Sequence, residues 1–149
     1  MKARLAALAA LLLVSLTIAS DLAMAGDLAR PELPAGGLSS GGLIATVGQH
    51  GNGNALVAGQ SGREQRLSAS QRGRQNQASV TQDGGSNTIE LQQNGNGNEA
   101  TIVQGGTGNS ALVDQQGNLN SARIEQYGRD ASARVTQTGN GKRAIVIQH

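Results

Sequence analysis

From Leu43 to the last residue, short stretches of the chain alternate between apolar and polar positions, and the alternation restarts every eleven residues. Stepping by eleven divides residues 43–149 into ten units, and no insertion is needed anywhere. The units begin at Leu43, Asn54, Gln65, Asn76, Asn87, Asn98, Asn109, Asn120, Ala131 and Lys142. A fixed period of this kind indicates an architecture built by stacking one small structural unit.

Within each unit the apolar residues occupy the third and fifth positions, as Ala, Leu or Ile at the third and Val, Ala, Leu or Ile at the fifth. This period of two places the apolar side chains on one face of a β-strand of about seven residues. In a helix the same alternation would spread them around the circumference. Each unit is therefore expected to be one strand followed by a turn.

Two further positions of the unit are fixed, the seventh as glutamine and the ninth as glycine. The glutamines are Gln49, Gln60, Gln71, Gln82, Gln93, Gln104, Gln115, Gln126, Gln137 and Gln148. The glycines are Gly51, Gly62, Gly73, Gly84, Gly95, Gly106, Gly117, Gly128 and Gly139. Glycine suits the turn that follows each strand, and the glutamine extends the inward row of the strand.

A single strand of seven residues cannot bury its apolar face, so successive units are expected to fold back onto each other. Two units then form one coil of 22 residues, and five coils stacked about 4.8 Å apart form a β-solenoid. The predicted fold is all-β, with two parallel sheets enclosing a thin interior and with a cross-β mode of assembly.

The interior of such a solenoid contains many amide groups, which are costly to bury unless they are hydrogen-bonded. In a parallel, in-register stack each amide can donate to its equivalent one coil away. The fixed glutamines are expected to form one ladder in the odd units and one in the even units. The first position supplies further amides, at Asn54, Asn76, Asn87, Asn98, Asn109 and Asn120.

The outward positions support the same register, because like charges directly opposite on neighbouring strands are destabilising. Two units apart, Glu90, Leu112 and Arg134 share one column without repeating a charge. The last unit holds the aliphatic run 145–147, and only Lys142 and Arg143 oppose strand addition there. The ends are therefore expected to add further chains by templating, which produces a fibre with strands across its axis.

The first 25 residues have the pattern of a secretory signal peptide. A basic start precedes an apolar run from Leu5 to Ile18, and Ala23 and Ala25 form a small-residue cleavage site. About 14 apolar residues are too few to span a bilayer as a helix. Residues 26–42 contain both prolines and five glycines, so they are expected to form a flexible leader that serves as a linker or a secretion-targeting segment.

Composition argues against an ordinary globular domain. Tyr127 is the only aromatic residue, cysteine is absent, and Leu, Ile and Val make up about 18% of residues 26–149. The net charge of the chain is only +2 and its arginines are scattered, so no nucleic-acid partner is expected. The densest basic group is Arg63, Arg66, Arg72 and Arg74, and a solvated face is favoured there over an acidic partner.

Three other functional classes fit the repeat poorly. An enzyme is not expected, because His50 and His149 stand apart and no carboxylate pair recurs. Calcium binding is not favoured, because the few aspartates of the repeats do not share a unit position. An ice-binding solenoid would need a flat array of threonines, and the threonines here are dispersed. No catalytic residue, metal ligand or cofactor is predicted.

Two units carry a specific resemblance to a known family. Residues 98–104 read Asn-Glu-Ala-Thr-Ile-Val-Gln and are followed by Gly106, and residues 120–126 read Asn-Ser-Ala-Arg-Ile-Glu-Gln and are followed by Gly128. They resemble the repeats of curlin, the subunit of curli amyloid fibres, and the resemblance extends over Leu43–His149. It implies export to the periplasm, passage through an outer-membrane secretion channel with accessory proteins, and assembly at the cell surface into fibres for adhesion and biofilm.

The curlin family contains a major, fibre-forming subunit and a minor subunit that nucleates it. The charged repeats and the basic, aliphatic run 142–148 resemble the minor subunit more closely. The leader and the scarcity of aromatic residues match neither subunit, so the major subunit remains the alternative.

Overall fold

The computed structural model describes residues 10–18, 38–40 and 42–149, and every regular element in them is a β-strand. Among these residues no helix is long and apolar enough to cross a membrane. The strands are β1 (Ala10–Ile18), β2 (Leu38–Ser40), β3 (Leu43–Asn52), β4 (Asn54–Arg63), β5 (Arg66–Arg74), β6 (Gln77–Gly85), β7 (Thr88–Asn96), β8 (Glu99–Thr107), β9 (Ser110–Asn118), β10 (Ser121–Arg129), β11 (Ser132–Thr138) and β12 (Arg143–Gln148).

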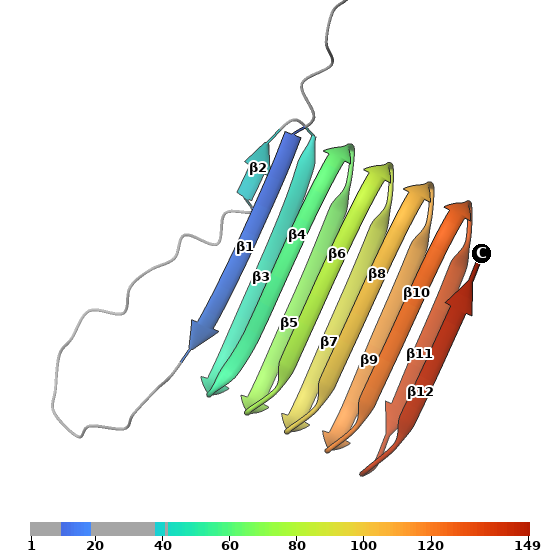
Figure 1. Ribbon diagram of the computed structural model, residues 1–149. Helices are drawn as coiled ribbons and strands as arrows, with labels where there is room; N and C mark the ends of the chain where they lie inside the picture. The colour runs from blue at the N-terminus through green and yellow to red at the C-terminus, as the bar shows by residue number, and fades with distance from the viewer. Residues whose placement is uncertain (1–9, 19–37, 41) are drawn as a thin grey trace, which may run out of the picture.

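The strands form two sheets, which lie face to face in Figure 1. Sheet A has the order β1-β4-β6-β8-β10-β12, and sheet B has the order β11-β9-β7-β5-β3-β2. From β3 onward neighbouring strands are parallel and are offset by 22 residues, so that Gln60 lies opposite Gln82. The prediction of an all-β solenoid with five 22-residue coils and two parallel sheets is confirmed.

The interior between the sheets is formed by the third, fifth and seventh positions of the units, together with the first position in most units. Along β7 the burial alternates at every residue, with Ile89, Leu91 and Gln93 inside and their neighbours exposed. A continuous apolar core extends from Ala45 to Val135, and Val47, Ala144 and Val146 pack against its ends. Alternating side chains that point to opposite faces of a strand therefore produce one narrow interior.

Most repeat strands are longer than the seven residues expected, because pairing continues past the glycine at the ninth position to the tenth. At each such glycine φ is positive, between 102° and 133°. A Cβ atom added at Gly95 would lie 1.8 Å from the carbonyl oxygen of Gly117 in the next coil. Glycine is thus needed inside the end of the strand, where two backbones approach closely.

The turn itself is made at the eleventh position, which the sequence pattern leaves variable. At this position the backbone is left-handed in each of the first nine units, with φ between 54° and 71°. The tenth unit ends before this position. Five of these residues are not glycine: Glu64, Gln75, Ser86, Leu119 and Asp130. Each such residue in a left-handed conformation costs about 1 kcal/mol, so the stack imposes this conformation on the turn.

The N-terminal edge of each sheet carries an antiparallel strand. β1 pairs with β4 from Ala10↔Gly62 to Ile18↔Asn54, and β2 pairs with the start of β3. β1 belongs to the predicted signal peptide and β2 to the predicted leader. The predicted cleavage site at Ala23 and Ala25 lies outside the described residues, as does most of residues 26–42.

Candidate assembly surface

The glutamines at the seventh position form two hydrogen-bonded ladders that run in one direction. In sheet A each Nε2 donates to the Oε1 of the glutamine 22 residues later, at 2.7, 3.1, 2.8 and 2.8 Å from Gln60 to Gln148. In sheet B Gln49 donates to Gln71, and the three bonds from Gln71 to Gln137 are 2.7, 2.9 and 2.8 Å long. Every ladder bond therefore has its donor on the N-terminal side.

The direction of the ladders is set by the opposite sheet. The same Nε2 also donates to a backbone carbonyl 16 residues earlier, which lies across the interior. Gln93 reaches Gln77 O at 3.0 Å, and Gln71 reaches Ala55 O at 3.0 Å. An amide oxygen in that place would face a carbonyl oxygen, which is repulsive. One amide nitrogen thus joins adjacent coils and also joins the two sheets.

The ladders end differently at the two ends of the solenoid. On the first coil, Oε1 of Gln49 and Oε1 of Gln60 are buried without a hydrogen-bond partner. On the last coil, Gln137 and Gln148 donate only to carbonyls of the opposite sheet, at 3.1 and 3.2 Å. Because a primary amide has two N–H groups, each of these two glutamines keeps one N–H for a further acceptor.

β1 covers the first coil of sheet A but donates no hydrogen bond to the glutamine ladder of that sheet. Leu12 of β1 is the partner of Gln60 in the backbone register. β1 therefore supplies backbone pairing to β4 and leaves the amide oxygen of Gln60 unpaired. A buried acceptor without a partner costs about 1–3 kcal/mol, so a strand with an in-register glutamine would fit this edge better.

The asparagines at the first position form part of the amide-to-amide ladder expected for them and otherwise bond to the backbone. Nδ2 of Asn76 donates to Oδ1 of Asn54, and Nδ2 of Asn98 donates to Oδ1 of Asn76, each at 3.1 Å. Asn54 Oδ1 accepts from the backbone N–H of Asn76 at 3.0 Å, and this bond recurs in later coils. Asn54 Nδ2 donates to His50 O and to Gly73 O, at 3.1 and 3.0 Å. These residues therefore secure the turns. The last coil has Ala131 and Lys142 at this position and cannot continue the pattern.

A second asparagine ladder lies on the surface and was not expected from the eleven-residue pattern. Nδ2 of Asn96 donates to Oδ1 of Asn118 at 2.9 Å, and Nδ2 of Asn118 donates to Oδ1 of Asn140 at 3.1 Å. These residues occupy the tenth position of odd units only. A search at the 22-residue coil period would have found them, because Asn recurs there while even units differ.

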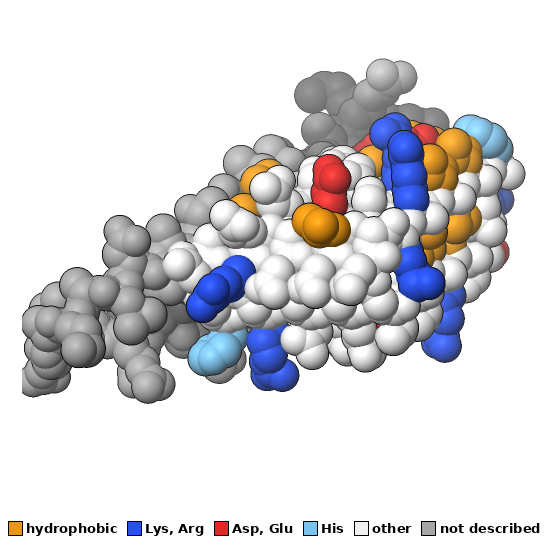
Figure 2. Space-filling view, turned by 90° about the horizontal axis from the view of Figure 1, so that it is seen from below, with side chains coloured by type: hydrophobic (Ala, Val, Ile, Leu, Met, Phe, Trp, Pro, Cys, Tyr) orange, Lys and Arg blue, Asp and Glu red, His pale blue; other side chains and the backbone are white. Residues whose placement is uncertain are grey.

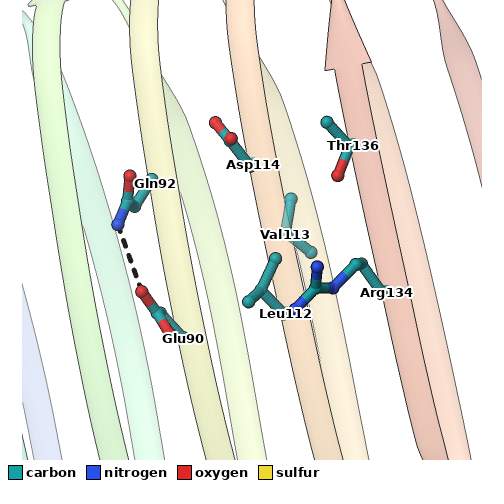
Figure 3. Close-up of a pocket in the computed structure, with 7 residues that line it drawn as sticks. All are labelled: Glu90, Gln92, Leu112, Val113, Asp114, Arg134 and Thr136. Atoms are coloured by element: carbon teal, nitrogen blue, oxygen red, sulfur yellow. Dashed lines mark hydrogen bonds between the residues drawn. The ribbon is translucent and has the colours of Figure 1, made fainter.

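The outer faces carry the charge columns expected from the register. Glu90, Leu112 and Arg134 follow one another across β7, β9 and β11. Figure 3 shows this column beside a second one, Gln92, Asp114 and Thr136, along a shallow groove. Within the groove Gln92 Nε2 donates to Glu90 Oε1 at 3.1 Å. Among the described residues no group of three His, Cys, Asp or Glu side chains could hold a metal ion.

The last coil leaves apolar side chains in solvent. Ile145 and Ile147 of β12 are 51% and 53% exposed on the outer face of sheet A. At the opposite end, Val57 of β4 is 47% exposed. Ile145 and Val57 both occupy the fourth position of an even unit, so they would become neighbours if a second solenoid continued the stack.

Comparison with known families supports the repeat found in the sequence. The family model for the curlin associated repeat matches five overlapping segments, at residues 66–95, 85–117, 95–128, 106–139 and 120–149. Together they span residues 66–149, more than half of the chain. The chain belongs to the curlin family. No curated protein and no solved structure matches it.

Curlins are structural subunits of extracellular amyloid fibres that assemble from their own kind. The segments matched in this curlin begin at Arg66, so the first coil lies outside them. Its strands nevertheless pair in the same register, with Gln49 opposite Gln71 and Gln60 opposite Gln82. All five coils thus share one geometry.

Proposed function

We propose that this curlin is a secreted fibre subunit whose copies stack head to tail, with the last coil of one copy against the first coil of the next. The observation that carries this proposal is the complementarity of the two ends. The last coil keeps the amide N–H groups of Gln137 and Gln148, and the first coil has the unpaired oxygens of Gln49 and Gln60. Continuing the register pairs β11 with β3 and β12 with β4 of the next copy.

Stacking requires the outer edges of β3 and β4 to be free. β2 stays in the mature chain and pairs with residues 43–45 of β3, so an incoming strand must displace it. Processing of the chain would free the edge of β4. β1 lies within the segment 1–25 that the sequence identifies as a signal peptide, so cleavage after Ala25 would remove it. An incoming chain then offers a parallel strand with an in-register glutamine. The incoming strand gives the open edge of β4 backbone hydrogen bonds and gives the oxygen of Gln60 an amide donor, which favours templated addition.

The ladder ends can be tested by seeded elongation of the mature chain, residues 26–149. Replacing Gln49 and Gln148 together by Ala should slow elongation, because it removes one amide from each face of the junction. The matched control replaces the exposed Gln92 and Gln116, which lie on the outer surface. Equal rates for the two double variants would contradict the ladder mechanism, and fibres without a reflection near 4.8 Å would contradict cross-strand stacking.

Within the fibre, the role proposed for this chain is that of the minor subunit, which nucleates polymerisation at the cell surface. The basic and aliphatic last coil, with Lys142, Arg143, Ile145 and Ile147 exposed, supports this role by its resemblance to minor curlins. Export through the periplasm and an outer-membrane channel, and service in adhesion and biofilm, are part of the same proposal.

Nucleation can be separated from fibre formation by a mixing experiment. A trace of the mature chain should abolish the lag phase of a major curlin subunit, because a preformed terminal coil removes the need for a nucleus. An unchanged lag would exclude the nucleating role. If the chain also formed fibres rapidly by itself, the alternative assignment as a major subunit would be favoured.

A further inference from the structure

One set of turns carries two pairs of basic residues, one pair near each end of the solenoid. We call it the lower arc, because it forms the lower edge of Figure 1, and it comprises residues 50–55, 72–77, 94–99, 116–121 and 138–143, one set per coil. The second coil contributes Arg72 and Arg74, and the last coil contributes Lys142 and Arg143; all four are exposed. Glu99, in the third coil, is the only acidic residue of the lower arc.

The surface view shows the same separation. Figure 2 looks at the molecule from below, and its Lys and Arg side chains gather toward both ends while the middle is mostly uncharged. Within one molecule the two basic groups are three coils apart, about 14 Å along the stack. At that separation the charges are largely screened at ordinary ionic strength, since the Debye length is about 10 Å at 0.1 M.

Stacking changes this separation. In the proposed head-to-tail register, which this inference takes over from the proposed function, β12 lies directly before β4 of the next copy. Lys142 and Arg143 then lie two coils, about 10 Å, from Arg72 and Arg74 of that copy. The first coil of the lower arc brings no acidic residue between them. Four positive side chains therefore lie on one edge of every junction, within two coils of one another.

We propose that repulsion between the basic residues of the lower arc acts as an electrostatic gate at the junction between copies. Self-stacking is then slow at low ionic strength and becomes faster when salt screens these charges. The partner that fits this surface is a second copy of the chain. Amide donors and acceptors at the junction favour the contact, while Arg72, Arg74, Lys142 and Arg143 oppose it. Lys142 also occupies the first position of its unit, where the earlier coils of the lower arc carry asparagine, so no first-position amide offsets the repulsion there.

Seeded elongation of the mature chain at several NaCl concentrations tests the gate. The wild-type rate should rise by about tenfold between about 0.02 M and 0.5 M salt, as screening shortens the Debye length. Arg74→Glu should raise the low-salt rate by a similar factor and flatten the salt dependence, because a carboxylate at this position attracts the basic end of the neighbouring copy.

The control is Arg134→Glu, which changes the net charge equally but lies on the outer face of sheet B, away from the lower arc. It should leave most of the salt dependence in place. A wild-type rate that does not depend on salt, or equal behaviour of the two variants, would overturn the gate while leaving fibre formation intact. Failure of every chain to form cross-β fibres at any salt concentration would instead overturn the proposed function together with the gate.

Discussion

Individual residues at the eleventh position of each unit show how the stack controls local conformation. Gly53, Gly97 and Gly141 adopt the left-handed region easily, and Gln75 and Leu119, in the same column, adopt it as well. Leu119 is also 71% exposed, so its side chain gains little from burial. The left-handed turn is therefore imposed by the hydrogen bonds of neighbouring coils, such as Leu119 N–H to Asn96 O at 2.9 Å.

Leu119→Gly is expected to stabilise the solenoid by up to about 0.5 kcal/mol, because glycine removes the left-handed strain and loses part of that gain to unfolded-chain entropy. Chemical denaturation of the monomeric mature chain, followed by circular dichroism, measures the change. Leu112→Gly makes the same replacement in the extended part of β9 and should destabilise by about 1 kcal/mol or more. Destabilisation of similar size in both variants would show that position eleven carries no strain.

At the scale of the strand, the glutamine ladder is the element that joins coil to coil and sheet to sheet. Gln93 accepts from Gln71, donates to Gln115 and also donates to the carbonyl of Gln77 across the interior. Leu and Ile can fill the same volume and cannot make these three bonds. The seventh position is therefore fixed by hydrogen bonding, while the third and fifth vary among small and branched apolar residues.

Gln93→Ala should destabilise the solenoid by about 2–4 kcal/mol, because it leaves the amide of Gln71 and the oxygen of Gln115 buried without ladder partners. Gln92→Ala is the matched control, since this neighbouring side chain points to solvent and bonds only to Glu90. It should change the free energy of unfolding by less than about 0.5 kcal/mol. A similar loss in both variants would mean that the buried amides contribute no more than exposed ones.

For the whole molecule, the unpaired edge of β12 is the feature that separates a finished domain from a fibre subunit. Ser121 N–H donates forward to Lys142 O at 2.7 Å, and backbone N–H groups alternate sides along a strand. The N–H groups of Arg143, Ile145 and Ile147 therefore point away from β10. In the proposed stack they form the template row for the next copy.

Ile145→Pro should block growth from the last coil and leave the solenoid folded, because proline removes an N–H that has no partner within the molecule. Elongation from fragmented seeds should fall by about tenfold or more, since each strand pair loses a backbone bond and a β-branched contact. Val146→Pro is the control: its N–H points to β10, so the fold itself should lose about 3 kcal/mol. Normal elongation by Ile145→Pro would contradict the head-to-tail junction, because that junction uses β12 whichever end of the fibre grows.

The sequence by itself determined the period, the fold class and the inward row of each strand. Eleven-residue spacing and alternation suffice for this, because a one-residue slip would move every Ala, Val and Gln to the wrong face. It also predicted which glutamines meet. The tertiary structure decided the direction of their hydrogen bonds, since the carbonyl that orients Gln93 belongs to Gln77 in the opposite sheet.

Other features depended on the coil period of 22, which brings together residues that are far apart in the chain. Arg63, Arg66, Arg72 and Arg74 form one cluster in the sequence, but the structure divides them between two opposite turn regions. Arg74 then shares the lower arc with Lys142, on the opposite end of the solenoid. The left-handed eleventh position was likewise invisible in the sequence, because backbone bonds between coils fix its conformation whatever side chain it carries.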